Sequence, residues 1–498
     1  MFKQSITLLL ILYIFIGVQP AICQTLQSIK AEVQEFTLDN GLHFVVLERH
    51  EAPVVSFHTY ADVGAANETY GITGISHLLE HMAFKGTKTV GTTDYDKERV
   101  LLNELDRLYN QMWQLKMAPE PDSMKLKVLE EKFEEKRLAA KELVVNNEFI
   151  DLMRKEGDAG VNAYTSNDAT QYIHSFPSNR LEFWMAAESD RFLNPVFREF
   201  YKEKDVVMEE RRLRTDNTPI GKLLEEFFAI AFKAHPYKHP VVGHMSDLQR
   251  IHRSDVEDYF ETYYIPSNMV IGIVGDVDTK EVKKLAEVYW SRIPSGPKPE
   301  PVRTTEPSQQ GEKHFYVEAQ SQPLVIAGYH RPAADHPDDA PLEALANILG
   351  QGRSSRIYTT LVKEEKIAAQ TGSFNGFPGT KYPNLFAVFA MPSKDHSNEE
   401  CLAAIDNEIE KMQNELVTDL ELQKFKRNYR KNLFDAMKSN ANMARLLTNS
   451  EVLYGDWRAL FDETDQINAV TAEEIQRVAK KYLVKKNRTI GKLIPQSL

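Results

Sequence analysis

Residues 74–87 read GISHLLEHMAFKGT, a stretch that contains the string H-x-x-E-H. The apolar residues of the slightly longer segment Thr73–Thr87 predict a buried helix. One helical turn separates His77 from His81, so both imidazoles lie on one face with the Glu80 carboxylate beside them. Two imidazoles and a carboxylate placed in this way can meet one metal ion and its water. The spacing is typical of a catalytic zinc site in which the more common H-E-x-x-H order is reversed.

A third metal ligand has to come from elsewhere in the chain, because a hydrolytic zinc site keeps three protein ligands and leaves one position for water. Within residues 194–214, Glu203 and Glu210 share one helical stripe with Val206 and Val207. A carboxylate that faces a core is unfavourable unless it is paired or binds a metal. We therefore predict Glu210 as the third ligand and Glu203 as a supporting acidic group that orients a ligand histidine or the attacking water.

Two alternatives for this helix stay open from the residues alone. Basic neighbours surround Glu210, so it could be an ordinary salt-bridged helix carboxylate. Glu209 is the other candidate ligand, although it points about 100° away around the helix.

Several matched stretches resemble the pitrilysin/insulysin-like zinc peptidases, the inverzincins, and within them the branch that includes mitochondrial processing peptidase and bacterial zinc peptidases. These stretches are GISHLLEHMAFKGT (74–87), GVNAYTSNDATQY (160–172), EKDVVMEERR (203–212), HPYKHPVVG (235–243), YYIPSNMVIGIVGDV (263–277), VIAGYHRPAADHPD (325–338) and ILGQGRSSRIYTTL (348–361). The resemblance implies an α+β fold of two homologous domains, each a mixed β-sheet covered by helices. It also implies one Zn²⁺ per chain held by His77, His81 and Glu210, with Glu80 as general base and Glu203 as a supporting catalytic residue.

The resemblance further implies a substrate strand. Residues 162–165 are similar to the family's edge strand, on which Asn162 and Ala163 would receive an extended peptide by strand addition. The alternative is a plain strand that follows a bend at Gly160. His235, Tyr237 and His244 also stand out, but a His-Pro-Tyr loop is more often structural than metal-binding.

The implied function is a zinc-dependent endopeptidase that hydrolyses extended peptides or unfolded polypeptides. The alternatives are a non-catalytic peptide-binding or assembly subunit of a peptidase-like heterodimer, and a scaffold that zinc only stabilises. In single-chain members of the family the second half carries an arginine and, seven residues later, a tyrosine that hold substrate. The matching positions here are Val362 and Ala369, which cannot donate those hydrogen bonds. We therefore expect a similar second subunit that supplies the pair, or a homodimer.

Composition is that of a large globular protein. The 498 residues exceed one usual domain, and 42% hydrophobic with 27% charged residues suits sizeable cores. A net charge of −12 gives no electrostatic basis for binding nucleic acid.

The N-terminus predicts export. Lys3 precedes the apolar run Ile6–Val18, and small residues before Gln24 suit cleavage after a signal peptide of residues 1–23. A lipid anchor on Cys23 and a membrane span are the alternatives that we disfavour. Cleavage would leave Cys401 without a disulfide partner. Export without disulfides, in a protein large enough to bury its own core, fits a bacterial periplasm better than a small extracellular scaffold. We therefore expect a periplasmic or secreted chain with no membrane span in its mature form.

Turn and breaker residues divide the chain into a catalytic domain at 24–293, a Pro-rich linker at 294–311 and a non-catalytic companion domain at 312–498. The first domain is expected to open with a hairpin around Leu38–Leu42, followed by a strand at Val54–Val63. The second domain is expected to begin with a strand at Leu324–Tyr329 and a helix at Pro341–Leu349 that carries no histidine.

A helical hairpin insertion is predicted at about residues 100–158. Leu101, Leu105, Leu108 and Met112 recur at helical spacing, and prolines then break the chain before a charged helix resumes. Such a hairpin could dock a partner, gate substrate entry, or be a solvated element without such a role.

Overall fold

A computed structural model describes residues 26–496 of the chain. The signal peptide predicted at residues 1–23 lies outside the described residues. None of the helices within residues 26–496 combines the length and the apolar character that crossing a bilayer requires. Cys401 is buried and forms no disulfide within the part of the chain that the structure describes.

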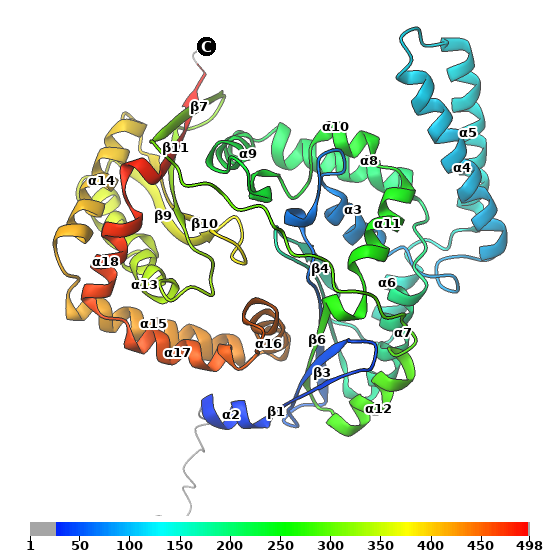
Figure 1. The fold of residues 1–498 in the computed structure, drawn as a ribbon, viewed down its shortest axis with the longest axis horizontal. Coiled ribbons are helices and arrows are strands. Elements are labelled where there is room, and N and C mark those ends of the chain that lie inside the picture. The colour runs from blue at the N-terminus through cyan, green and yellow to red at the C-terminus, as the bar shows by residue number, and fades with distance from the viewer. Residues whose placement is uncertain (1–25, 497–498) are drawn as a thin grey trace, which may run out of the picture.

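The first half folds around a six-stranded mixed sheet with the order β1-β2-β6-β3-β5-β4 (Figure 1). Its strands are β1 (Val33–Thr37), β2 (His43–Glu48), β3 (Val54–Ala61), β4 (Asn162–Thr165), β5 (Thr170–Pro177) and β6 (Met269–Gly275). The predicted hairpin is confirmed, since β1 and β2 pair antiparallel around a turn in which Gly41 adopts a positive φ of 95°. The predicted strand at 54–63 is confirmed as β3, although β3 ends at Ala61.

The second half contains a five-stranded sheet with the order β7-β11-β8-β10-β9. Its strands are β7 (Lys313–Ala319), β8 (Leu324–Arg331), β9 (Ala368–Phe377), β10 (Asn384–Pro392) and β11 (Arg488–Pro495). Its pairing repeats that of the first sheet: the parallel pair β7/β11 corresponds to β2/β6, and antiparallel strands follow in the same order. The prediction of two homologous domains with mixed sheets is thereby confirmed. The prediction that Leu324–Tyr329 is the first strand of this half is wrong, because β7 precedes that strand.

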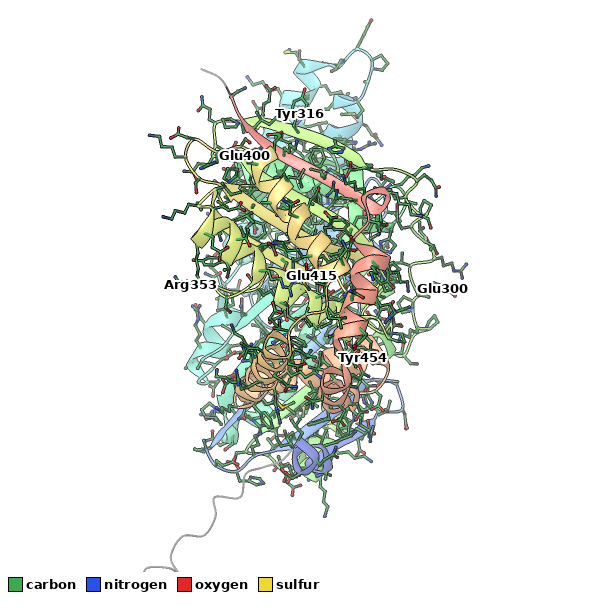
Figure 2. The ribbon with its side chains drawn as sticks, turned by 90° about the vertical axis from the view of Figure 1, so that its left-hand side faces the viewer. Glu300, Tyr316, Arg353, Glu400, Glu415 and Tyr454 are labelled. Atoms are coloured by element: carbon green, nitrogen blue, oxygen red, sulfur yellow. The ribbon has the colours of Figure 1, made fainter. Side chains whose placement is uncertain are left out.

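Helices cover both sheets. In the first half they are α2 (Leu26–Glu32), α3 (Ile75–Met82), α4 (Tyr95–Lys116), α5 (Ser123–Leu143), α6 (Glu148–Lys155), α7 (Leu181–Leu193), α8 (Phe200–Arg211), α9 (Pro219–Ala231), α10 (Met245–Arg250), α11 (Arg253–Tyr263) and α12 (Thr279–Tyr289). In the second half they are α13 (Asp339–Gly350), α14 (Asn398–Asn414), α15 (Asp419–Met437), α16 (Asn440–Tyr454), α17 (Ala459–Ala469) and α18 (Ala472–Tyr482). The predicted helix at 341–349 is confirmed as α13. Figure 2 views the second half from its helical side, where Glu400 lies in α14 and Glu415 directly follows it.

Each half contributes one helix to the sheet of the other half. In β2, Phe44 and Val46 face the core of the first half, whereas Val45 and Leu47 pack in a cluster with residues of α16. In the second sheet, Ile326 of β8 packs in a cluster with residues of α9. Residues 290–312, all within the described part, form no helix or strand, as the predicted linker requires. The proposed boundaries at 293 and 312 therefore separate the strands of the two sheets but not the helices that cover them.

The predicted helical hairpin is present. Helices α4 and α5 pack against each other through small buried clusters that include Leu105, Leu108 and Leu129, and they project from the first half (Figure 1). Residues 117–122 separate the two helices, where the prolines were expected to break the chain.

Candidate metal centre

Helix α3 carries the two histidines and is shorter than predicted, since it spans Ile75–Met82 rather than 73–87. Its first residues are held by Glu68, whose carboxylate accepts the N–H of Gly74 at 2.7 Å and of Ser76 at 2.9 Å. A carboxylate at a helix N-terminus satisfies free N–H groups and interacts favourably with the helix dipole. Gly74 has a φ of 90°, and a Cβ there would lie 2.6 Å from the Val242 carbonyl oxygen. The position directly before α3 therefore requires glycine.

Helix α8 carries the acidic residues. Glu203 and Glu210 lie two turns apart, and Val207 between them is fully buried. The placement of Val206 in the same inward stripe is wrong, because its side chain is 44% exposed. Glu209 is turned outward, where it binds Arg212 at 2.8 Å, and it is not part of the histidine cluster. The geometry therefore selects Glu210 over Glu209.

His77, His81 and Glu210 come together although they are far apart in the sequence. The Nε2 atom of His77 lies 3.7 Å from Oε1 of Glu210, and Nε2 of His81 lies 3.4 Å from Oε2. All three offered ligand atoms lie within 4.8 Å of one another. Ligands on a tetrahedral zinc ion, at bond lengths of about 2.0–2.1 Å, are roughly 3.4 Å apart. The spacing and the N/N/O donor set fit zinc.

The charge state of His77 also suits a cation. Burial lowers the pKa of His77 to about 3, which leaves a neutral imidazole of the kind that binds metals. Its buried Nδ1 has no hydrogen-bond partner among the described residues. Glu210 also binds Arg214 at 2.8 Å, the salt-bridge alternative foreseen from the sequence, but the Arg214 side chain is 73% exposed at the rim.

Glu203 lies behind His81. Its Oε2 atom is 3.5 Å from Nδ1 of His81, and its Oε1 is 2.5 Å from Nζ of Lys85. Burial alone would raise the pKa of Glu203, but hydrogen bonds from His81 and Lys85 lower it below its ordinary value. For His81 the directions are reversed: burial lowers its pKa, but the nearby carboxylates of Glu203 and Glu210 have the larger effect and raise it. Glu203 therefore contacts His81 on the side away from Glu210's ligand atom and is not part of the ligand cluster.

Glu80 faces the predicted substrate strand. Its Oε2 accepts a hydrogen bond of 2.6 Å from the Thr165 hydroxyl at the end of β4, and burial raises its pKa. Strand β4 is an edge strand of the sheet, as predicted, and it contains Asn162 and Ala163. An open pocket of about 690 Å³ brings the ligand cluster, Glu80 and Ala163 together, and its lining residues all come from the first half.

The remaining candidate residues stand apart from the ligand cluster. His235 accepts the N–H of Tyr237 at 3.2 Å, and His244 lies 3.3 Å from Glu225, as the structural interpretation of these histidines expects. Val362 packs against the core of the second half, whereas Ala369 is exposed on β9. Nearby Arg356 is bound to Glu421 at 2.8 and 3.0 Å.

Thr165 and Lys85 were not foreseen as site residues. Lys85 could have been found from its position one turn after His81. Thr165 could not, because its contact with Glu80 joins segments that are 85 residues apart.

A second group, Glu35, His43 and Glu451, also has three donor atoms close together. Glu35 is already bound there by Arg458 at 2.8 Å and by the Trp457 indole at 2.7 Å. We assign no metal to this group.

Known proteins resemble this chain in sequence. The model of "Insulinase (Peptidase family M16)" matches residues 44–104, and "Peptidase M16 inactive domain" matches residues 250–429. The zinc protease PqqE of Helicobacter pylori is 28% identical over 92% of this chain and 91% of its own. A probable mitochondrial-processing peptidase subunit beta of Arabidopsis thaliana is 23% identical over 93% of this chain and 78% of its own.

Solved structures show the same fold. A protease from Helicobacter pylori has a TM-score of 0.78 and 26% identity, and the match covers 93% of this chain and 99% of that one. The fold thus places the chain in the class of insulinase-like peptidases with two homologous domains. The chain belongs to peptidase family M16. Relatives that match it over most of its length are named zinc proteases.

Proposed function

We propose that the chain is a zinc-dependent endopeptidase that hydrolyses extended peptides or unfolded polypeptides, with one Zn²⁺ per chain. The observation that carries this proposal is the convergence of His77, His81 and Glu210 beside Glu80 and the edge strand β4. A zinc ion held by these three residues would supply a water of lowered pKa and polarise the scissile carbonyl.

The protein's own residues perform the remaining tasks. Glu80 accepts a proton from the attacking water and returns it to the leaving amine, as a general base and then a general acid. Thr165 holds Glu80 by its hydroxyl, and Glu203 holds His81. The free edge of β4, at Asn162 and Ala163, pairs with the peptide backbone, which gives affinity with little demand on the peptide's side chains.

The partner and the location form part of the same proposal. Because Val362 and Ala369 cannot donate hydrogen bonds from their side chains, a similar second subunit supplies the arginine and tyrosine, or two copies of this chain bind peptide by strand pairing alone. The predicted signal peptide directs the chain to the periplasm or the exterior.

The alternative is a non-catalytic peptide-binding or assembly subunit. It is favoured by Val362 and Ala369, which stand where the single-chain members carry the substrate-holding arginine and tyrosine. Peptide cleavage is therefore measured for the wild type, for Glu80→Gln and for a chelated sample, each with and without the product of a neighbouring similar gene. The proposal expects zinc-dependent cleavage that Glu80→Gln abolishes. Peptide binding without cleavage in every sample would establish the alternative.

A further inference from the structure

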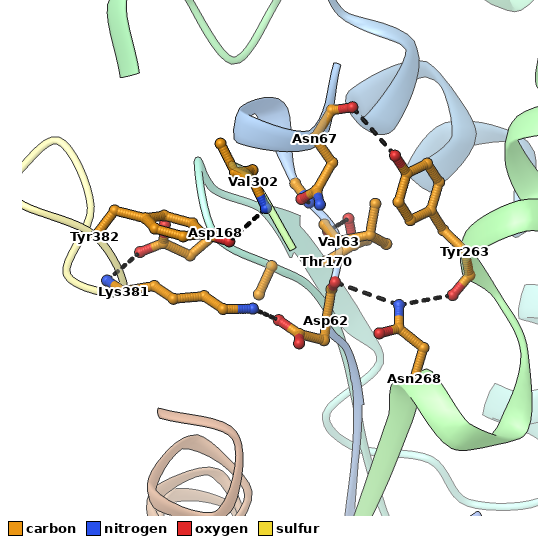
Figure 3. Close-up of polar contacts among 12 residues, drawn as sticks. Asp62, Val63, Asn67, Asp168, Thr170, Tyr263, Asn268, Val302, Lys381 and Tyr382 are labelled. Carbon is orange, nitrogen blue, oxygen red and sulfur yellow. Dashed lines mark hydrogen bonds and ion pairs between the residues drawn. The ribbon is translucent and has the colours of Figure 1, made fainter. Parts of the chain in front are cut away.

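The loop between β9 and β10, residues 378–383, reaches from the second half to the turn between β4 and β5 in the first half (Figure 3). Asp168 of that turn accepts the backbone N–H of Thr380 at 2.7 Å and of Lys381 at 3.1 Å through one carboxylate oxygen. Its other oxygen accepts the Tyr237 hydroxyl. One buried carboxylate thus binds backbone and side-chain donors from two distant segments.

An ion pair lies beside this contact. Nζ of Lys381 binds Oδ1 of Asp62, directly after β3, and the two side chains are only 22% and 12% exposed. Charges shielded from water attract each other more strongly than exposed ones, and removing one partner leaves the other unpaired. The loop also fits closely, because a Cβ on Gly379 would lie 2.6 Å from both Asp168 Oδ2 and the Tyr237 hydroxyl.

The turn that the loop contacts is continuous with the residue that binds Glu80. Ser166 opens the turn, donates its N–H to the Ala169 carbonyl at 2.8 Å, and accepts the N–H of Ala65 at 3.1 Å. Thr165, the residue before it, ends β4 and donates to Glu80. Movement of the turn would therefore move both the peptide-binding edge and the hydroxyl that holds Glu80.

We propose that the β9–β10 loop is a positioning element for the peptide-binding strand, and that Lys381 and Asp168 are positioning residues that fix β4 relative to Glu80. This inference rests on the proposed function and adds a role for the second half within the chain: it aligns the peptide-receiving edge through this loop. Neither residue touches the ligand cluster, so zinc binding does not depend on them.

The test compares Lys381→Met, Asp168→Asn and Gly379→Ala with the wild type in the full chain. Lys492→Met is the matched control, because Lys492 binds Glu399 at 2.7 Å within the second half and contacts none of the site residues. For each protein the zinc content, the kcat and KM for an extended peptide, and the deuterium uptake of residues 160–172 are measured. Lys381→Arg is the conservative variant that should restore the contact.

The inference expects KM to rise about tenfold in the first three variants, the equivalent of one charge-assisted hydrogen bond. Deuterium uptake of residues 160–172 should rise with it, while zinc content stays at the wild-type level and Lys381→Arg and Lys492→Met resemble the wild type. Unchanged uptake in Lys381→Met and Gly379→Ala would overturn the inference, whether or not the protein cleaves peptides. Raised uptake with unchanged KM would overturn it as well. A wild type that cleaves no peptide would refute the proposed function instead.

Discussion

Arg198→Met should destabilise the protein strongly, because Arg198 is a fully buried cation that joins the loop after α3 to the helical hairpin. Its guanidinium binds Glu98 of α4 at 2.9 and 3.3 Å, and it also donates to the carbonyls of Lys85, Val90 and Thr87. Arg198 is 1% exposed and Glu98 0%.

Methionine keeps the packing of the arginine stem but leaves the Glu98 carboxylate buried and unpaired, which costs about 3–5 kcal/mol. Carbonyls that lose a donor add about 1–2 kcal/mol. A total near 5 kcal/mol corresponds to a fall in melting temperature of about 5 °C for a chain of 498 residues. Calorimetry on the metal-free protein measures this fall. The double variant Arg198→Met/Glu98→Leu should recover most of it, because no buried charge then remains.

The matched control is Arg303→Met, since Arg303 binds Glu300 at the surface, where both side chains are more than 70% exposed. Its melting temperature should stay within about 2 °C of the wild type. A similarly small change for Arg198→Met, or a double variant no more stable than the single one, would refute the assignment of this buried pair.

Three further predictions concern single carboxylates. Glu203→Gln should weaken zinc binding about 10- to 100-fold in competition with a chelator, while Glu209→Gln on the outer face leaves it unchanged; equal affinities would exclude the orienting role of Glu203. Although burial raises the pKa of Glu421, hydrogen bonds from Arg356 and Thr418 lower it to about 2. This lowered pKa contributes about 1 kcal/mol to the free energy of unfolding, after allowance for solvent, at pH values above the ordinary pKa of 4.5, and the contribution is lost as the pH falls toward 2. Glu421→Gln should therefore reduce the loss of stability between these pH values. An unchanged dependence of stability on pH in this range would contradict the prediction. Glu68→Gln keeps one acceptor oxygen for the N–H groups of Gly74 and Ser76. It should therefore lower the free energy of unfolding, measured by denaturant titration, by about 1–2 kcal/mol. An unchanged free energy of unfolding would contradict the capping role of Glu68.

Periodicity in the sequence predicted the local elements well. The H-x-x-E-H spacing placed His77 and His81 on one face, and the acidic stripe identified Glu210, because both depend only on the geometry of a single helix. The hairpin at Leu38–Leu42 and the helical insertion were recognisable because turn residues and prolines act locally.

Contacts between distant segments were not recognisable. Helix α3 ends at Met82 rather than Thr87, and the loop that follows is bound by Arg198, more than a hundred residues away. Strand β7 was missed because alternate side chains of this sheet-edge strand are exposed, so it lacks the apolar run of a buried strand. The exchange of α9 and α16 between the halves leaves no local signal, since an apolar helix face does not say which sheet it covers.

We propose that two imidazoles and one carboxylate hold a single zinc ion beside Glu80. Anomalous diffraction at the zinc edge from crystals of the Glu80→Gln variant, grown with zinc and an extended peptide, tests it most directly. We predict one anomalous peak per chain, about 2.0–2.2 Å from Nε2 of His77, Nε2 of His81 and a Glu210 oxygen, with uncleaved peptide along β4. Zinc bound elsewhere, or no zinc between these three residues, would show that they do not form the metal site.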